Sequence, residues 1–260
     1  MGKVLSKDGT AIAFDRAGEG PPVILVAGAF ADRSQLDELA ALLAAQFTVF
    51  NYDRRGRGES GDTSPYALER EIEDLDVLIG AAGGTAFVFG GSSGAALALE
   101  AAAAGLAIEK LAVYEPPYVV DDSRAPVPAD IATQLSELVL AGRRGDAAAL
   151  FMTAGAQIPP EVVAGMRKLE FWPATEAVAH TLVYDATIMG PGNNLPAARL
   201  AVVSAPTLVI DGGASPPWIR AAAQAVADHL PSATRSTLPD QMHDVAQNVL
   251  GPVVAEFLAR

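Results

Sequence analysis

The stretch Phe87-Val88-Phe89-Gly90-Gly91-Ser92-Ser93-Gly94-Ala95 decides the fold, because an apolar run leads straight into Gly-x-Ser-x-Gly. An alanine-rich stretch typical of a helix follows it. A serine at the tip of such a strand-to-helix turn lies on strained backbone, so the residues flanking it, Gly90 and Gly94, must be small. The helix after it would direct free amide groups and its positive dipole end at a negative charge forming beside Ser92. The stretch therefore predicts a nucleophilic serine rather than a glycine-rich turn alone.

The sequence around this stretch predicts a mostly parallel sheet. Apolar runs typical of strands buried on both faces alternate with helical patterns, which predicts an α/β fold with eight strands and helices on both faces. An Asp-Gly turn near the N-terminus predicts an antiparallel hairpin. The expected strands cover 4–5, 11–14, 23–27, 47–52, 86–89, 111–114, 207–210 and 233–238, and the expected helices cover 34–46, 68–81, 93–104, 218–230 and 245–258.

The alternation is interrupted by about ninety residues between Tyr114 and Thr207. Helical patterns separated by Pro and Gly fill the gap, at 130–141, 146–154, 160–168 and 174–189. We predict a helical lid over residues 121–200, inserted after the sixth strand at the C-terminal edge of the sheet. Residues 1–120 and 201–260 would form the core. One domain with a large insertion also fits a length of 260 residues.

Composition excludes several kinds of function. Eighteen basic and 31 acidic residues give a net charge of −13, which repels nucleic acids and anionic membranes, so we expect a small-molecule substrate instead. The absence of cysteine excludes disulfides, thiolate catalysis and sulfur-ligated metals, and with only three histidines we predict no metal and no cofactor. The start, MGKVLSKDGT, lacks the apolar run of a secretory signal, and no apolar stretch reaches the ~20 residues of a membrane span. These features predict a cytoplasmic monomer or homodimer.

Only the three histidines are considered as the general base for Ser92. His180 falls in an expected lid helix, and His229 lies at a helix end where it would face solvent or cap the helix. His243 lies in the loop between the last strand and the last helix, at the same sheet edge as Ser92. This chain order fits a serine and histidine that are distant in sequence but close in space. His243 is therefore the predicted base.

Two carboxylates could orient His243. Glu115 follows the strand 111–114 and Asp211 follows the strand 207–210, so both belong to the same edge of the sheet. Either could hold the imidazole tautomer and stabilise the imidazolium. Glu115 could instead anchor the Pro116-Pro117 turn, and Asp211 could cap the turn at 212–213. The residues alone leave the choice open.

With these features in place, nearly the whole chain resembles the α/β-hydrolase superfamily, in particular its esterase, lactonase and cofactor-free haloperoxidase-like branch. The stretch 53–60, Asp-Arg-Arg-Gly-Arg-Gly-Glu-Ser, is similar to the family's Asp-x-Arg-Gly-x-Gly-x-Ser turn, in which Asp53 and the arginines would brace the loop. Ala27-Gly28-Ala29 replaces the family's usual His-Gly-x. The resemblance then implies an oxyanion hole made by the backbone amides of Ala29 and Ser93, which the replacement leaves in place.

A second departure concerns the acid. The family's usual aspartate position after the seventh strand is Ser215 here, and some members, among them certain dehalogenases and a fungal-toxin lactonase, use a glutamate directly after the sixth strand. The resemblance therefore favours Glu115 over Asp211. Serine at the nucleophile position argues against dehalogenase and epoxide-hydrolase chemistry, which use a carboxylate nucleophile.

The resemblance implies that Ser92 attacks an ester or lactone carbonyl, that His243 moves the proton, and that water then hydrolyses an acyl-enzyme. Alternatives are a cofactor-free lyase, cyclase or perhydrolase of a biosynthetic pathway, a non-enzymatic binding module, and a thioesterase or peptidase. Aromatic residues could form a largely apolar substrate pocket, although at helical spacing they more often form the core of a lid. They are Phe30, Phe151, Phe171, Trp172, Tyr184 and Trp218.

Overall fold

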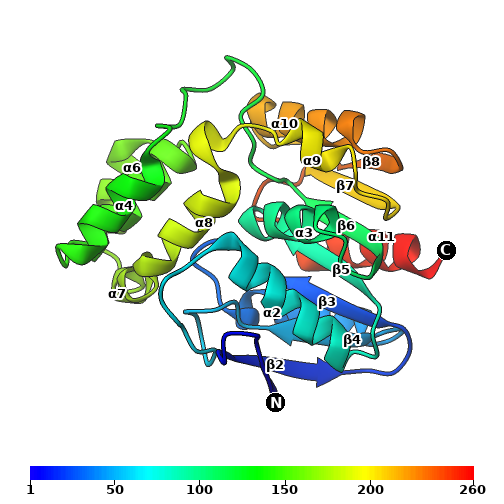
Figure 1. Ribbon diagram of the computed structural model, residues 1–260. Coiled ribbons are helices and arrows are strands. Elements are labelled where there is room, and N and C mark those ends of the chain that lie inside the picture. The colour runs from blue at the N-terminus through cyan, green and yellow to red at the C-terminus, as the bar shows by residue number, and fades with distance from the viewer.

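The computed structural model describes residues 1–260 and is built on one eight-stranded sheet (Figure 1). The strands lie in the order β1-β2-β4-β3-β5-β6-β7-β8; β1 and β2 pair antiparallel, β2 also pairs antiparallel with β4, and all other pairs are parallel. The predicted mostly parallel α/β sheet is therefore confirmed. The strands are β1 (Gly2–Leu5), β2 (Ala11–Ala17), β3 (Pro22–Val26), β4 (Thr48–Tyr52), β5 (Ala86–Gly91), β6 (Ile108–Tyr114), β7 (Thr207–Gly212) and β8 (Ala233–Leu238).

Helices cover both faces of the sheet. Successive side chains of β3 point to opposite faces, so Val23 and Leu25 join one apolar cluster while Ile24 and Val26 join another. The first cluster is completed by α1 (Asp37–Leu43) and α11 (Gln247–Ala259), and the second by α2 (Leu68–Ala81), α3 (Ser93–Ala103) and α10 (Pro217–His229). Figure 1 shows α2 and α3 in front of the central strands and α11 behind them. This double covering explains why the central strands are almost uninterrupted apolar runs.

The predicted helix over 34–46 is shorter in the structure. A 3₁₀ turn, Arg33–Leu36, precedes α1, and the carboxylate of Asp32 accepts a hydrogen bond from the Ser34 amide at 2.9 Å. This side-chain cap is typical of the start of a helical segment. The loop after β3 therefore turns sharply before α1 begins.

A run of helices lies between β6 and β7. It comprises α4 (Ile131–Leu140), α5 (Arg144–Leu150), a π-helical turn (Phe151–Gly155), α6 (Pro160–Met166), α7 (Trp172–Ala177), α8 (Leu182–Met189) and α9 (Ala197–Leu200). The single helix expected over 174–189 is two helices, α7 and α8, separated by a 3₁₀ turn at Ala179–Thr181. Figure 1 shows α4, α6 and α7 away from the sheet, with α8 between them and α3. The role of this insertion as a lid, and the division into core and lid, stay predictions.

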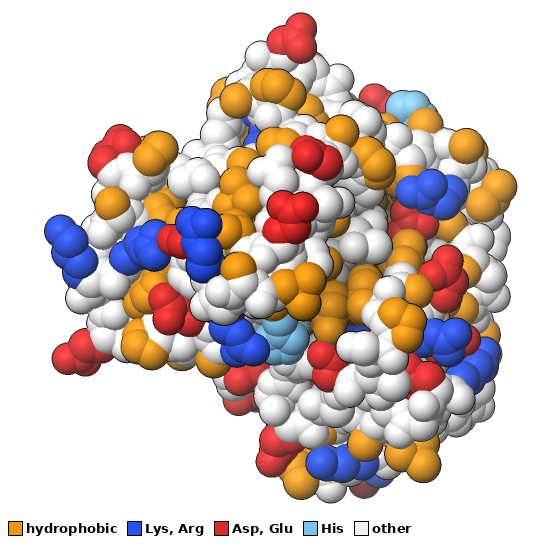
Figure 2. Space-filling view, turned by 60° about the vertical axis from the view of Figure 1, so that its left-hand side comes forward, with side chains coloured by type: hydrophobic (Ala, Val, Ile, Leu, Met, Phe, Trp, Pro, Cys, Tyr) orange, Lys and Arg blue, Asp and Glu red, His pale blue; other side chains and the backbone are white.

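The surface mixes charges of both signs. Figure 2 shows acidic and basic side chains interspersed with apolar ones, without a uniformly basic area on the face in view. Pairs such as Arg143 with Asp146 at 2.7 Å and Arg167 with Asp146 at 2.9 Å bring opposite charges together on the insertion. None of the helices combines the length and the apolar content that crossing a bilayer requires.

Candidate active site

Ser92 lies on the sharp turn between β5 and α3. Its backbone has φ 55° and ψ −125°, a conformation that costs energy for a residue with a side chain. A Cβ atom on Gly90 would lie 2.5 Å from the carbonyl oxygen of Gly94, and one on Gly94 would lie 2.4 Å from the carbonyl oxygen of Val26. Any side chain at either position would therefore collide with backbone. The close approach of β3, β5 and α3 at this point explains the two flanking glycines.

The side chains of Ser92, His243 and Glu115 form one hydrogen-bonded chain. His243 Nε2 lies 3.1 Å from Ser92 Oγ, and His243 Nδ1 lies 2.6 Å from Glu115 Oε2. The carboxylate of Glu115 is fully buried, and its Oε1 accepts a hydrogen bond from the Gly212 amide at 2.8 Å. The three residues follow β5, β6 and β8, and the carboxyl ends of these parallel strands share one edge of the sheet. The structure thus brings together the predicted nucleophile, the predicted base and the preferred acid.

Asp211, the other candidate acid, lies elsewhere. Its carboxylate accepts hydrogen bonds from Arg235 Nε at 2.8 Å and Nη2 at 2.9 Å, and from Thr237 Oγ1 at 3.1 Å. Asp211 is within β7 and in register with Thr237 of β8, so its side chain projects onto a sheet face, where Arg235 also points. Glu115 lies beyond the end of its strand and can reach the loop of His243. Asp211 is therefore an ion-pair partner inside the sheet, and it neither contacts His243 nor caps the turn at 212–213.

Strained backbone gathers at this edge. Six residues other than glycine have positive φ, and four of them follow β3, β5, β6 and β8: Phe30 (62°), Ser92 (55°), Glu115 (47°) and Asp240 (58°). Such conformations persist only where the surrounding structure holds them, and they concentrate at functional sites. This clustering is independent of the side-chain hydrogen bonds and marks the same place.

The loop after β3 lies against Ser92. A Cβ atom on Gly28 would be 3.1 Å from the Cβ of Ser92, so the Ala29 amide lies close to the nucleophile. Ser93 is the first residue of α3, and its amide has no acceptor within the helix. Neither the Ala29 amide nor the Ser93 amide donates a hydrogen bond within the chain. Both are free to donate to a negatively charged oxygen beside Ser92, as the predicted oxyanion hole requires.

Tyr114 is a site residue that the sequence analysis did not identify. Its hydroxyl donates a hydrogen bond to the carbonyl oxygen of Met242 at 2.5 Å, which anchors the loop that carries His243. Burial and the negative charge of Glu115 raise the pKa of Tyr114, so the hydroxyl stays protonated and remains a donor. A tyrosine at the end of a buried strand needs a partner for its hydroxyl, and that need is the signal that could have identified it.

Only part of the predicted aromatic pocket lies near this site. The rings of Phe30 and Phe151 meet edge to face, with centroids 5.5 Å apart, next to the Ala29 loop. Trp172 packs inside the apolar cluster of the insertion and donates to Glu176 at 2.7 Å, and its part in a substrate pocket stays a prediction. Phe171 is 45% exposed on the surface of the insertion, and its pocket role likewise stays a prediction.

Two other predicted pocket residues make structural contacts. The Tyr184 hydroxyl donates to Asp62 at 2.7 Å and its ring stacks on Tyr66, which joins α8 to the loop after β4. Trp218 is buried at the start of α10, with the Arg124 guanidinium 4.5 Å from its ring centroid. Both residues therefore pack between segments, and direct substrate contact by either of them stays a prediction.

The two remaining histidines take no part in the hydrogen bonds that link Ser92, His243 and Glu115. His229 Nδ1 lies 2.7 Å from the carbonyl oxygen of Ala225 at the end of α10. His180 belongs to the insertion, and its Nε2 lies 3.8 Å from Asp62 in the loop after β4. No three side chains of His, Cys, Asp or Glu are grouped so that they could hold a metal ion.

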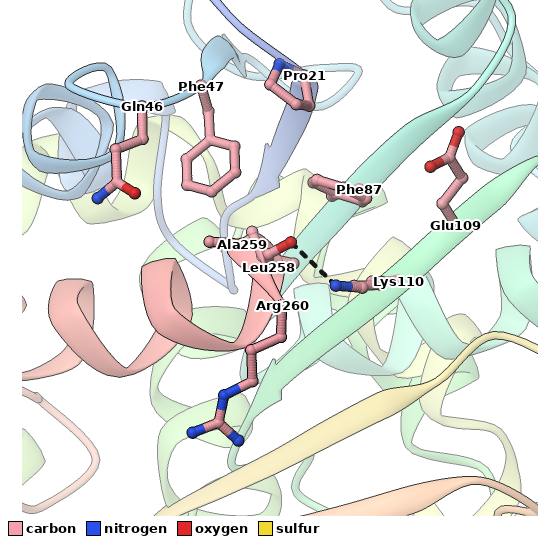
Figure 3. Close-up of a pocket in the computed structure, with 9 residues that line it drawn as sticks. All are labelled: Pro21, Gln46, Phe47, Phe87, Glu109, Lys110, Leu258, Ala259 and Arg260. Atoms are coloured by element: carbon pink, nitrogen blue, oxygen red, sulfur yellow. Dashed lines mark hydrogen bonds between the residues drawn. The ribbon is translucent and has the colours of Figure 1, made fainter.

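A cavity of about 450 Å³ lies at the other end of the strands, near the points where β5 and β6 begin (Figure 3). Its lining includes Phe87 and Lys110, near the start of β5 and β6, and Lys110 donates to the carbonyl oxygen of Leu258 at 3.0 Å. Ser92 is five residues beyond Phe87, which corresponds to about 16 Å along a strand. This cavity is therefore not the space into which Ser92 opens.

Comparisons with known proteins agree with this architecture. The family described as the alpha/beta hydrolase family matches residues 23–254. The crystal structure of an alpha/beta hydrolase from Sphaerobacter thermophilus DSM 20745 is 59% identical, with a TM-score of 0.93 over 99% of this chain and 100% of that one. A thermophilic esterase from Thermogutta terrifontis is 22% identical, with a TM-score of 0.76 over 99% of this chain and 97% of that one, and shares the fold.

A curated relative is also similar over a shorter region. The uncharacterized hydrolase YraK of Bacillus subtilis (strain 168) is 34% identical over 100 residues, which are 37% of this chain and 37% of that protein. The similarity thus spans little more than a third of the relative's length.

Proposed function

Since the chain belongs to the alpha/beta hydrolase family, we propose that it is a serine hydrolase that cleaves a carboxylic ester or lactone through an acyl-enzyme on Ser92. The single observation that carries the proposal is the hydrogen-bonded chain from Ser92 through His243 to the buried Glu115. A nucleophile, a base and a group that orients the base are the set that acyl transfer by serine needs.

In the proposed reaction, His243 Nε2 removes the proton of Ser92 as Oγ attacks the carbonyl carbon of the substrate. The amides of Ala29 and Ser93 donate to the oxygen that becomes negative, and Glu115 holds the imidazolium with its proton on Nδ1. His243 then protonates the departing alkoxide, which leaves as the alcohol. Water, deprotonated by the same imidazole, attacks the acyl-enzyme and releases the acid and Ser92.

The substrate class in this proposal is small and largely apolar. The Phe30 and Phe151 rings border the loop that carries the Ala29 amide, and both belong to or pack against the apolar cluster of the insertion. An apolar acyl or alkoxy group beside Ser92 would contact these rings, and its transfer out of water would favour binding.

The test is hydrolysis of p-nitrophenyl acetate by the purified protein, with the Ser92→Ala variant beside it. We expect the wild type to release nitrophenolate with saturation kinetics and Ser92→Ala to lose at least 10³-fold in kcat, because the nucleophile is removed. Ser232→Ala, an exposed serine away from the site, is the matched control and should keep wild-type kcat. A wild type without turnover, or an active Ser92→Ala variant, would refute the proposal.

A further inference from the structure

A fully buried carboxylate of the insertion touches the residues that form the proposed oxyanion hole. Asp185 lies on α8, and its Oδ1 accepts hydrogen bonds from Ser93 Oγ at 2.7 Å and from Arg54 Nη1 at 2.8 Å. Its Oδ2 accepts one from Arg57 Nη2 at 2.7 Å. All four residues are at most 2% exposed. These contacts join the insertion to the start of α3 and to the loop after β4.

Two partners of Asp185, Ser93 and Arg57, are connected to donors of the oxyanion hole. Ser93 carries one of the two amides. Arg57 Nη1 donates to the carbonyl oxygen of Gly28 at 2.5 Å, and Arg54 Nη1 lies 3.4 Å from the carbonyl oxygen of Ala27. The Gly28 carbonyl and the Ala29 amide belong to one planar trans peptide, so they point in opposite directions. Holding the Gly28 oxygen toward Arg57 therefore turns the Ala29 N–H away from Arg57.

The charges of this network are matched only while Asp185 is present. Glu71 accepts from Arg54 Nε and Nη2, both at 2.8 Å, so Arg54 has a second carboxylate. Arg57 has Asp185 as its ion-pair partner. Burial alone would raise the pKa of Asp185, but Arg57, Arg54 and the Ser93 hydroxyl outweigh it and hold that pKa below its usual value. These three partners thus favour the ionised form of the carboxylate.

We propose that Asp185 is a positioning residue for the oxyanion hole, acting on the Ser93 amide through the Ser93 hydroxyl and on the Ala29 amide through Arg57 and the Gly28 carbonyl. The inference rests on the proposed function, because it assigns a role in that reaction. It also makes the helical insertion a part of the catalytic geometry, since α8 supplies the carboxylate that fixes both backbone donors.

Two variants test this role. Ser93→Ala removes one hydrogen bond to Asp185 but keeps the Ser93 amide and all charges, so it should fold; Asp185→Asn removes the charge and both arginine pairs. Loss of one oxyanion donor lowers kcat about 10²- to 10³-fold in hydrolases, and a misplaced donor loses part of that. With p-nitrophenyl acetate we expect kcat to fall about tenfold in Ser93→Ala and about 100-fold in Asp185→Asn, with KM within twofold of wild type in both.

Glu100→Gln is the matched control. Glu100 also lies on α3 and pairs with Arg199 of α9 at 2.8 Å, so it is a second polar contact between α3 and the insertion, without a contact to the loop at 27–29. We expect this variant to lose thermal stability but to keep kcat within twofold. Equal losses of kcat in Glu100→Gln and Ser93→Ala would identify a general packing effect and overturn the inference.

The rate at which a fluorophosphonate modifies Ser92 gives a second readout, because the phosphonyl oxygen needs the same two amides. It should fall in parallel with kcat in Ser93→Ala. A folded Ser93→Ala with wild-type kcat and labelling rate, or one in which only KM rises, refutes the positioning role even if Asp185→Asn does not fold. A wild type that neither hydrolyses the ester nor reacts with the phosphonate instead refutes the proposed function, and this inference with it.

Discussion

Glu115→Gln is expected to reduce kcat by about 10³- to 10⁴-fold while leaving KM within about threefold. The carboxylate accepts two hydrogen bonds, one from His243 Nδ1 at 2.6 Å and one from the Gly212 amide at 2.8 Å. A glutamine side chain has one acceptor oxygen and one donor NH₂ group, so it can satisfy only one of these partners. The Glu115 side chain is fully buried, so water cannot supply the missing acceptor there.

The size of the effect follows from the two orientations of the glutamine amide. If NH₂ faces His243, Nδ1 must become the acceptor and the ring proton moves to Nε2, which can no longer accept the proton of Ser92. If the amide oxygen faces His243, NH₂ opposes the Gly212 N–H and the negative charge that stabilises the imidazolium is still lost. Either case removes about 4 to 5.5 kcal/mol of transition-state stabilisation, at 1.36 kcal/mol per tenfold in rate.

Asp211→Asn is the matched control, because Asp211 is an equally buried carboxylate at the end of the neighbouring strand. It should lower stability by about 1–3 kcal/mol through loss of the ion pair with Arg235, yet keep kcat within threefold. The assay is steady-state hydrolysis of p-nitrophenyl acetate, with thermal unfolding followed by circular dichroism. The reasoning is wrong if Glu115→Gln keeps more than a tenth of wild-type kcat, or if Asp211→Asn loses as much.

Three further outcomes are expected. Gly94→Ala should unfold the protein or cost about 3 kcal/mol in urea denaturation, because its Cβ would lie 2.4 Å from the Val26 carbonyl oxygen; wild-type stability would contradict the elbow geometry. Tyr114→Phe should lower kcat about fivefold through loss of the bond to Met242, worth about 1 kcal/mol, and an unchanged kcat would show that the loop needs no such anchor. Burial lowers the pKa of His180 from its ordinary value of 6.5, so the unfolded chain binds more protons below that pH and stability falls as pH drops through 6.5. Between pH 7.5 and 5.5 the Tm of wild type should therefore decline more than that of His180→Gln, and parallel declines would contradict this.

Much of the fold could be predicted because the central strands are covered on both sides. Short apolar runs such as 23–27 and 86–89, alternating with helical patterns, are typical of strands in a doubly covered sheet, and the Asp-Gly turn specified the first hairpin. The helices of the insertion were harder to place. The apolar pattern over 174–189 continues through the 3₁₀ turn at Ala179–Thr181, so periodicity alone could not locate the break between α7 and α8.

The site residues divide in the same way. Ser92 and His243 stood out through local sequence and chain order, whereas the choice between Glu115 and Asp211 depended on which carboxylate lies beyond the end of its strand. A difference of one residue in strand length reverses the direction of such a side chain, and sequence patterns locate strand ends less finely than that. The sequence does not decide whether Trp172 and Tyr184 belong to a pocket or to the core of a lid, because aromatic residues of both have the same spacing. No sequence pattern distinguishes Asp185 from the other acidic residues, which number 31 in all, and its contact with Ser93 is visible only in the fold.

The most direct test of the central claim is to identify the residue that a fluorophosphonate modifies. Intact-mass and peptide mass spectrometry should show one phosphonyl group per chain, on Ser92 and not on the adjacent Ser93. Ser92→Ala should remain unmodified, and His243→Ala should react at least 100-fold more slowly because the base is missing. A wild-type chain that stays unmodified, or a phosphonyl group that persists in Ser92→Ala, would contradict the account.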